Sequence, residues 1–128
     1  MPTVFPSLMY RDCPAAMVWL HEVLGFTEHA VYKDDQGQIM HAEMRFGNGM
    51  IMLGSKKAPG SLWDDIGPSS VYLTAPDAAA VDTAYARAET HSGEIVSPLK
   101  DQDYGSHEFT VKDPEGNMWS IGTYAPGA

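Results

Sequence analysis

The residues with the most obvious chemical potential are a histidine and a glutamate two positions apart, His41 and Glu43. If they lie on a β-strand, both side chains point to the same face. An imidazole and a carboxylate can ligate a metal ion, but two ligands fall short of the three protein ligands usual at a catalytic zinc. The pair therefore indicates either part of a metal site or, more simply, a polar pair in a pocket or across two strands.

A nucleophile is harder to find. Cys13, the single cysteine, stands where a helix should begin, and a helix start can stabilise a thiolate. No pattern places a histidine beside it, so a small structural residue is the preferred interpretation. A single cysteine cannot form an internal disulfide, which favours a reducing compartment, and we expect a cytoplasmic protein. No glycine-rich phosphate loop or serine nucleophile motif is present.

Composition and charge limit the partners. The 128 residues are 44% hydrophobic and 20% charged, as expected of one globular domain. A net charge of −9 argues against nucleic acid. The acidity serves either solubility or the attraction of a cationic ligand. No apolar run approaches the roughly 18 residues of a membrane span, and the first residues do not resemble a signal peptide, so we expect no membrane association.

Two stretches have the boundaries and the periodicity of helices. The first begins at Asp12, a good N-cap, with Pro14 in its first turn and Gly25 at its end. The second begins at Asp77, continues through an alanine-rich stretch and ends at Gly93. Both carry apolar residues at helical spacing, so each should pack one face against a sheet.

The remaining chain predicts eight short strands separated by turns. We place them near Val4–Tyr10, Thr27–Lys33, Met40–Phe46, Met50–Gly54, Ser70–Ala75, Glu94–Ser97, His107–Lys112 and Met118–Thr123. The order strand, helix, three strands thus occurs twice, at a nearly constant offset, which suggests an internal duplication. We predict an α+β fold in a single domain, residues 1–128, with modules at about 1–55 and 70–128 and a linker at about 56–69.

The strands alternate between two kinds of face. One face is apolar and should pack under the helices. The other carries small, polar and methionine side chains, which suit a ligand cup, a second packed face or a dimer interface. A two-residue hairpin at Gly47 and Asn48 would place His41, Glu43 and Arg45 on the face of Met52.

Two stretches support a family resemblance. Residues 109–124, FTVKDPEGNMWSIGTY, are similar to the final hairpin of the glyoxalase/bleomycin-resistance, or vicinal oxygen chelate, superfamily. Residues 41–47, HAEMRFG, are typical of its PhnB-like branch. The resemblance covers essentially the whole chain. It implies two βαβββ modules that form a curved mixed sheet around a cup.

The resemblance also implies where metal ligands would stand. Metal-dependent members carry one ligand on each of four strands, and the matching positions here are Phe5, Met52, Ser70 and Ser120. Phenylalanine cannot ligate, methionine is a soft ligand, and a serine hydroxyl binds divalent cations poorly. We therefore expect no metal and no other cofactor.

The leading functional hypothesis is a metal-independent protein that binds and sequesters a cationic or aromatic small molecule. Glu43 and Glu108 would meet a cationic group, and Trp63 and Tyr104 would stack on the ligand from the rim of the cup. The full set of candidate binding residues is Phe5, His41, Glu43, Met52, Trp63, Ser70, Tyr72, Tyr104, Glu108, Thr110 and Ser120.

Two alternatives stay open. One is a metal-dependent lyase, isomerase or dioxygenase of the same superfamily with relocated ligands such as His41 and Glu43. The other is a regulatory or scaffolding dimer whose cup is filled. In each case we expect a homodimer, because the resemblance implies one and because Pro6 suits an edge strand that needs cover.

Overall fold

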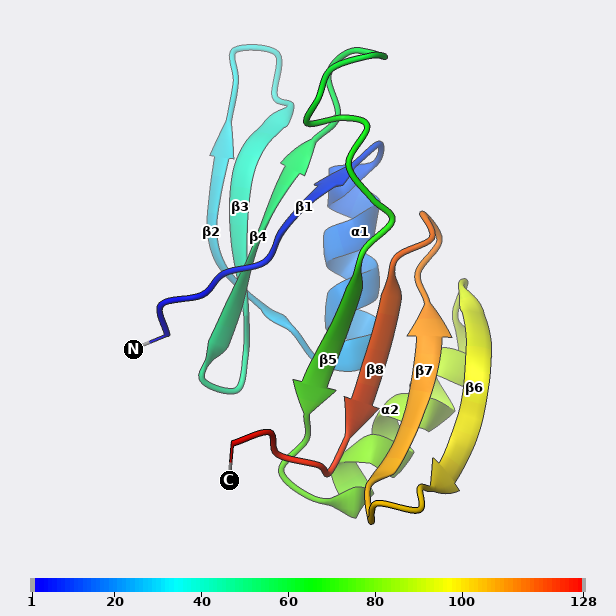
Figure 1. Ribbon diagram of the computed structural model, residues 1–128. Coiled ribbons are helices and arrows are strands. Elements are labelled where there is room, and N and C mark those ends of the chain that lie inside the picture. Colours follow the sequence, from blue (N-terminus) through cyan, green and yellow to red (C-terminus); the bar gives the residue numbers. More distant parts are fainter. Residues whose placement is uncertain (1, 128) are drawn as a thin grey trace. The chain divides into compact units, whose positions relative to one another are not determined.

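Two compact units make up the chain, which the computed structural model describes from residue 2 to residue 127 (Figure 1). Unit 1 ends at Gly67 and unit 2 begins at Pro68. The elements of unit 1 are β1 (Ser7–Tyr10), α1 (Cys13–Trp19), the π-helical turn η1 (Leu20–Leu24), β2 (Thr27–Lys33), β3 (Ile39–Phe46) and β4 (Gly49–Ser55). The elements of unit 2 are β5 (Ser70–Thr74), α2 (Ala78–Thr90), β6 (Glu94–Asp101), β7 (His107–Lys112) and β8 (Met118–Gly122).

Each unit contains one four-stranded mixed sheet. The strand orders are β1-β4-β3-β2 and β5-β8-β7-β6. In each sheet the first pair is parallel and the other pairs are antiparallel. The same topology therefore occurs twice, which confirms the predicted pair of βαβββ modules and the α+β class.

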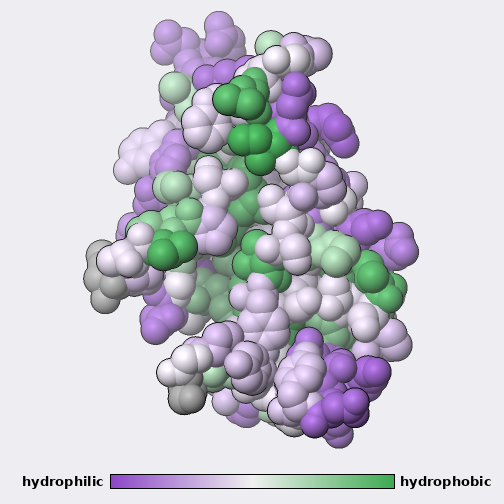
Figure 2. Space-filling model, viewed as in Figure 1, coloured by the Kyte–Doolittle hydropathy of each residue, from purple (hydrophilic) through white to green (hydrophobic). Residues whose placement is uncertain are grey.

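Each helix packs on one face of its own sheet. In unit 1, α1 packs on β1, β3 and β4, and in unit 2, α2 packs on β6, β7 and β8. The predicted N-caps are confirmed, since Asp12 accepts a hydrogen bond from the Ala15 amide at 3.1 Å and Asp77 from the Ala80 amide at 2.9 Å. The second helix ends at Thr90, before the predicted Gly93. Figure 2 views the face of the strands that α2 does not cover, and hydrophobic atoms reach this surface between polar ones.

Two predicted strands differ from the observed ones by more than one residue at an end. The first strand begins at Ser7, not Val4, because Pro6 has no amide hydrogen to donate to the ladder. The Pro6 carbonyl still accepts a hydrogen bond from the Met52 amide at 2.8 Å. The strand predicted at Glu94–Ser97 continues to Asp101 and passes through Pro98. A proline is tolerated there because β6 lies at the edge of its sheet.

The hairpin between β3 and β4 sets which side chains share a face. Phe46 pairs with Gly49, so the loop has the two residues predicted. Gly47 has a φ of 57°, as the first position of a type II′ turn requires. In this register Glu43 lies opposite Met52, and their side chains face away from the α1 side. The predicted face assignment of β3 is thereby confirmed.

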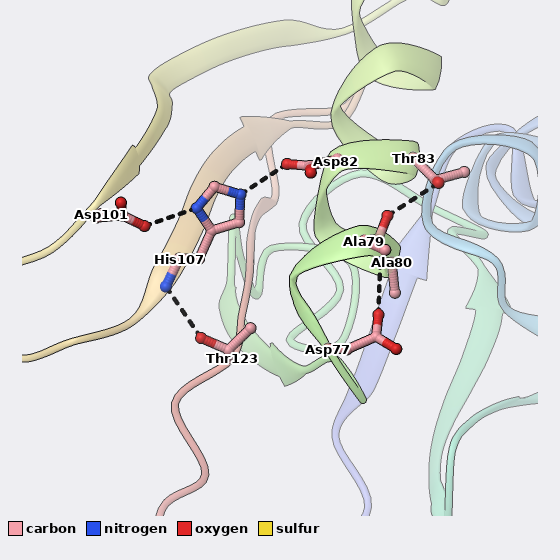
Figure 3. A network of polar contacts seen from close by, with 8 residues as sticks. All are labelled: Asp77, Ala79, Ala80, Asp82, Thr83, Asp101, His107 and Thr123. Carbon is pink, nitrogen blue, oxygen red and sulfur yellow. Dashed lines mark hydrogen bonds and ion pairs between the residues drawn. The ribbon is translucent and has the colours of Figure 1, made fainter.

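A histidine network ties three elements of unit 2 together (Figure 3). The His107 Nε2 lies 2.7 Å from Asp82 Oδ1 on α2, and its Nδ1 lies 2.8 Å from Asp101 Oδ1 on β6. Both ring nitrogens carry a hydrogen only in the imidazolium form. The pKa of His107 is therefore raised above its usual 6.5, mainly by the hydrogen bond to Asp82 and next by the hydrogen bond to Asp101.

This network predicts a pH-dependent stability. Because the folded pKa of His107 is raised, its contribution is fully present below about pH 6.5 and is lost as the pH rises through the folded pKa. We expect wild type to exceed His107→Gln in free energy of unfolding by more at pH 6 than at pH 9. Between pH 6 and pH 9, this difference in free energy of unfolding should fall by no more than about 1 kcal/mol, because the Asp82 and Asp101 carboxylates are solvent-exposed. Urea unfolding at the two pH values measures it, and an equal difference at both would contradict the prediction.

Candidate functional site

The first candidate site is a hollow in unit 1. It has a volume of about 570 Å³ and lies on the sheet face that carries Glu43 and Met52. Its apolar lining comes from Pro2, Phe5, Met50 and Met52, its polar lining from His29, Glu43 and Arg45, and its end from the Gly47–Gly49 hairpin. The sequence-predicted residues Phe5, Glu43 and Met52 are therefore brought together.

Polar groups in this hollow and beside it are partly paired with each other. His41 Nε2 lies 2.9 Å from Glu43 Oε2, and His29 Nε2 lies 3.9 Å from Glu43 Oε1. The His41 ring also stacks on Tyr32, with centroids 5.9 Å apart. His41 and Glu43 thus form the polar pair anticipated from their spacing, and His41 supports the hollow from beside it without lining it.

The second candidate site is a hollow in unit 2. Its volume is about 400 Å³, and its lining is Tyr72, Tyr104, Glu108, Tyr124 and Pro126. The Tyr104 hydroxyl donates a hydrogen bond of 2.6 Å to Glu108 Oε1. This bond is the main cause that raises the pKa of Tyr104 to about 12, so the phenol stays protonated and keeps donating.

Backbone and hydroxyl groups hold the aromatic side chains of this hollow in place. The Tyr124 carbonyl accepts hydrogen bonds from the Tyr72 hydroxyl at 2.8 Å and from Thr74 Oγ1 at 3.0 Å. The Tyr124 amide donates to Ser106 Oγ at 3.1 Å. The segment after β8 is thereby fixed to β5 and to the loop before β7.

Comparison with known proteins decides the family. A profile of the Glyoxalase/Bleomycin resistance protein/Dioxygenase superfamily matches residues 4–121. The chain belongs to this superfamily. Among curated proteins, none matches the chain. The PhnB-like branch stays a prediction.

Solved structures of the superfamily's fold are similar over nearly the whole chain. TioX from Micromonospora sp. ML1 is 27% identical with a TM-score of 0.78, over 98% of this chain and 100% of TioX. A lactoylglutathione lyase from Agrobacterium tumefaciens is 21% identical with a TM-score of 0.67, over 94% of this chain and 93% of the lyase. A glyoxalase/bleomycin resistance protein/dioxygenase from Nocardioides is 20% identical with a TM-score of 0.65, over 100% of this chain and 87% of that protein. The last two likenesses show the fold alone.

The residues at the four positions where the resemblance implies metal ligands do not fit a metal ion. In unit 1, Phe5 and Met52 form apolar lining. In unit 2, the Ser120 hydroxyl is hydrogen-bonded to Thr110 at 2.7 Å, and Ser70 is exposed at the start of β5. Within residues 2–127, no three His, Cys, Asp or Glu side chains are arranged to hold a metal ion.

The remaining sequence-predicted site residues divide between the two units. Tyr72, Tyr104 and Glu108 meet in the hollow of unit 2, whereas Ser70, Thr110 and Ser120 do not line it. Trp63 is 63% exposed and does not line the hollow of unit 1.

Sequence reasoning did not select several lining residues, of which His29 and Tyr124 have the clearest structural reasons. The β2–β3 register shifts between Glu28 and Ala30, and this irregularity at His29 turns its side chain toward Glu43. Tyr124 follows the end of β8, where strand alternation carries no information. The one sequence signal for Tyr124 is its position as the last residue of the stretch 109–124, which resembles the final hairpin of the superfamily.

Proposed function

We propose that the protein is a metal-independent small-molecule-binding protein that sequesters an aromatic or cationic compound. The observation that supports this proposal is the apolar hollow of unit 1, which Phe5, Met50 and Met52 line. Its volume falls within the roughly 300–1,000 Å³ of small-molecule sites.

The lining of the hollow suits a planar ligand with a polar group. Methionine side chains adapt to the shape of a ring, and Phe5 offers an aromatic surface. Arg45 and Glu43 lie at the same hollow and can orient charged or hydrogen-bonding substituents. Because His41 already bonds to Glu43, the apolar surface contributes most of the affinity and the charges contribute orientation.

Truncating the apolar lining should weaken ligand binding. We expect aromatic compounds that raise the melting temperature of the wild type to lose about five- to tenfold in affinity with Phe5→Ala or Met52→Ala, since each change removes apolar contact area. A ligand at 100 times its Kd adds about 2.7 kcal/mol of stability, so a thermal-shift screen detects binding.

Val18→Ala is the matched control, because Val18 is an exposed apolar residue on α1 that does not line the hollow. A folded wild type that no aromatic compound stabilises would contradict the proposal. So would elemental analysis showing about one tightly bound transition metal per chain.

We also propose that the protein is a homodimer. Three large apolar side chains, Leu62, Trp63 and Ile66, are at least half exposed in the segment that follows β4. Exposed apolar groups in one short segment are typical of an interface. A stable interface of the obligate kind would bury more than roughly 2,000 Å² in total.

Sedimentation equilibrium tests the dimer. At micromolar concentration we expect twice the chain mass of 14.0 kDa, and we expect Trp63→Asp to shift the population toward the monomer because it places a charge in the interface. A wild type that stays monomeric at every concentration would contradict the proposal.

For its location, we propose the cytoplasm, on the basis of the single buried cysteine, Cys13. Between residues 2 and 127, no helix has the length and apolar character needed to cross a membrane.

A further inference from the structure

We propose that the hollow of unit 2 binds the protonated amino group of an organic amine. We name Tyr72, Tyr104, Tyr124 and Glu108 the tyrosine cage. The inference goes beyond the proposed binding of a ligand in the hollow of unit 1, because the cage is built from other residues and is tested by other variants.

The aromatic rings of the cage are arranged around a common space. The Tyr72 and Tyr124 centroids are 6.3 Å apart with an interplanar angle of 64°, and those of Tyr104 and Tyr124 are 5.9 Å apart at 81°. All three side chains line the hollow of about 400 Å³. These distances and angles are those of edge-to-face contacts between the rings. A guest would therefore lie in the hollow that all three rings line, where a ring face attracts an ammonium group within about 6 Å.

A single carboxylate provides the countercharge. Glu108 is 9% exposed and lines the same hollow. Its Oε1 accepts the hydrogen bond from Tyr104, and its Oε2, to which no other residue in the described part of the chain bonds, is open to solvent. Buried glutamates are rare unless they are paired. An N–H donor on a bound cation would satisfy Oε2 and neutralise the charge.

Hydrogen bonds within the cage hold its side chains in place. The Tyr104 phenol, whose pKa is raised, holds Glu108 from one side. The Tyr72 hydroxyl is fixed on the Tyr124 carbonyl. Gly122 lies against them, and because it has no Cβ, the Glu108 and Tyr72 side chains can pack directly on the backbone of β8. A preorganised site loses little conformational entropy when it binds.

The chemistry of the cage favours an organic amine over a metal ion. One carboxylate and three phenol rings offer too few oxygen ligands for Ca²⁺ or Mg²⁺, which take six or more. The rings also provide apolar contact for the carbon atoms that adjoin the ammonium group. The net charge of −9 adds a general attraction for cations.

Calorimetric titration with three matched probes tests the proposal. Benzylammonium carries both the charge and the N–H groups, benzyltrimethylammonium carries only the charge, and benzyl alcohol carries neither the charge nor an ammonium N–H. We expect benzylammonium to bind at least tenfold more tightly than benzyl alcohol and several-fold more tightly than benzyltrimethylammonium.

Variants of the cage locate the binding. Glu108→Gln keeps an oxygen that accepts from Tyr104 but removes the charge, so we expect at least a tenfold loss for benzylammonium. Tyr124→Leu removes one ring but keeps the backbone carbonyl that accepts from Tyr72. Its affinity for benzylammonium should fall about two- to tenfold. Glu89→Gln, on the exposed face of α2, makes the same charge change away from the cage and should bind as the wild type does. Circular dichroism establishes that each variant is folded.

Three outcomes would overturn the proposal. They are equal affinity for benzylammonium and benzyl alcohol, an affinity for benzyltrimethylammonium that equals or exceeds that for benzylammonium, and unchanged benzylammonium binding by the folded Glu108→Gln variant. The test is separate from that of the proposed function, because Glu108→Gln and Tyr124→Leu report only on the tyrosine cage, whereas Phe5→Ala and Met52→Ala report on the hollow of unit 1. If the cage does not bind amines, the proposal that the hollow of unit 1 binds aromatic compounds is unaffected.

Discussion

Replacement of Asp113 by alanine should lower the free energy of unfolding by about 3 kcal/mol, because it leaves several buried donors without an acceptor. Asp113 is buried in the turn between β7 and β8. Its Oδ1 accepts from the Glu115 and Asn117 amides at 2.9 and 3.0 Å. Its Oδ2 accepts from Asn117 Nδ2 at 3.2 Å and from the Trp119 indole N–H at 3.1 Å.

The indole contact makes this aspartate more important than an ordinary turn residue. Trp119 is 0% exposed, so its N–H cannot find water when the carboxylate is removed. Asn117 Oδ1 also accepts from the Ser69 amide at 2.8 Å, which connects the turn to the start of β5. Replacing Asp113 should therefore destabilise both β5 and β8. Denaturant unfolding measures the free energy, and tryptophan fluorescence reports the environment of the indole.

Asp34 provides a matched control within the same chain. Its turn repeats the backbone pattern, because the Asp34 amide bonds to Gln38 O as the Asp113 amide bonds to Asn117 O. Asp34 Oδ1 also accepts from two backbone amides, those of Gln36 and Gln38. This carboxylate is more exposed and has no tryptophan partner, so Asp34→Ala should cost about 1 kcal/mol. Equal losses for the two variants would contradict the role assigned to the buried indole.

Replacement of Gly122 by alanine should lower the free energy of unfolding by about 2–3 kcal/mol and abolish benzylammonium binding. A Cβ at this position would lie 2.6 Å from Glu108 Cβ, 2.7 Å from Ser106 Oγ and 2.8 Å from the Tyr72 hydroxyl. Glu108 Cβ is close to the backbone of β7 and cannot move aside without shifting the strand, so the overpacking is costly. The same shift displaces the carboxylate and a phenol of the tyrosine cage.

Gly49 is the matched glycine for this test. A Cβ there would meet only the Phe46 carbonyl oxygen, at an ordinary 3.4 Å. Gly49→Ala should therefore change the free energy of unfolding by less than about 1 kcal/mol and leave benzylammonium binding intact. Calorimetry and denaturant unfolding are the two measurements. A Gly122→Ala variant as stable as Gly49→Ala would show that the strands can separate without cost.

The close approach at Gly122 and the partners of Asp113 illustrate what sequence patterns do not contain. The DPEGN stretch predicts a turn but not that its aspartate meets an indole six residues later. Likewise, alternation along β7 separates His107 from Glu108, but it does not predict that His107 meets Asp82 on α2. These contacts depend on how a helix or a turn sits on the sheet.

The sequence by itself determined the order of the elements and the faces of the hairpin strands. Local chemistry was sufficient there, since Asp12 and Asp77 cap their own helices and a two-residue loop forces Glu43 opposite Met52. Only the tertiary structure decided which candidates share a hollow. Tyr72, Glu108 and Tyr124 come from segments far apart in the chain, and an irregularity at His29 is absent from any alternation pattern. Periodicity assigns a side chain to a face, but strand register, bulges and the path after a strand end set its distance from another.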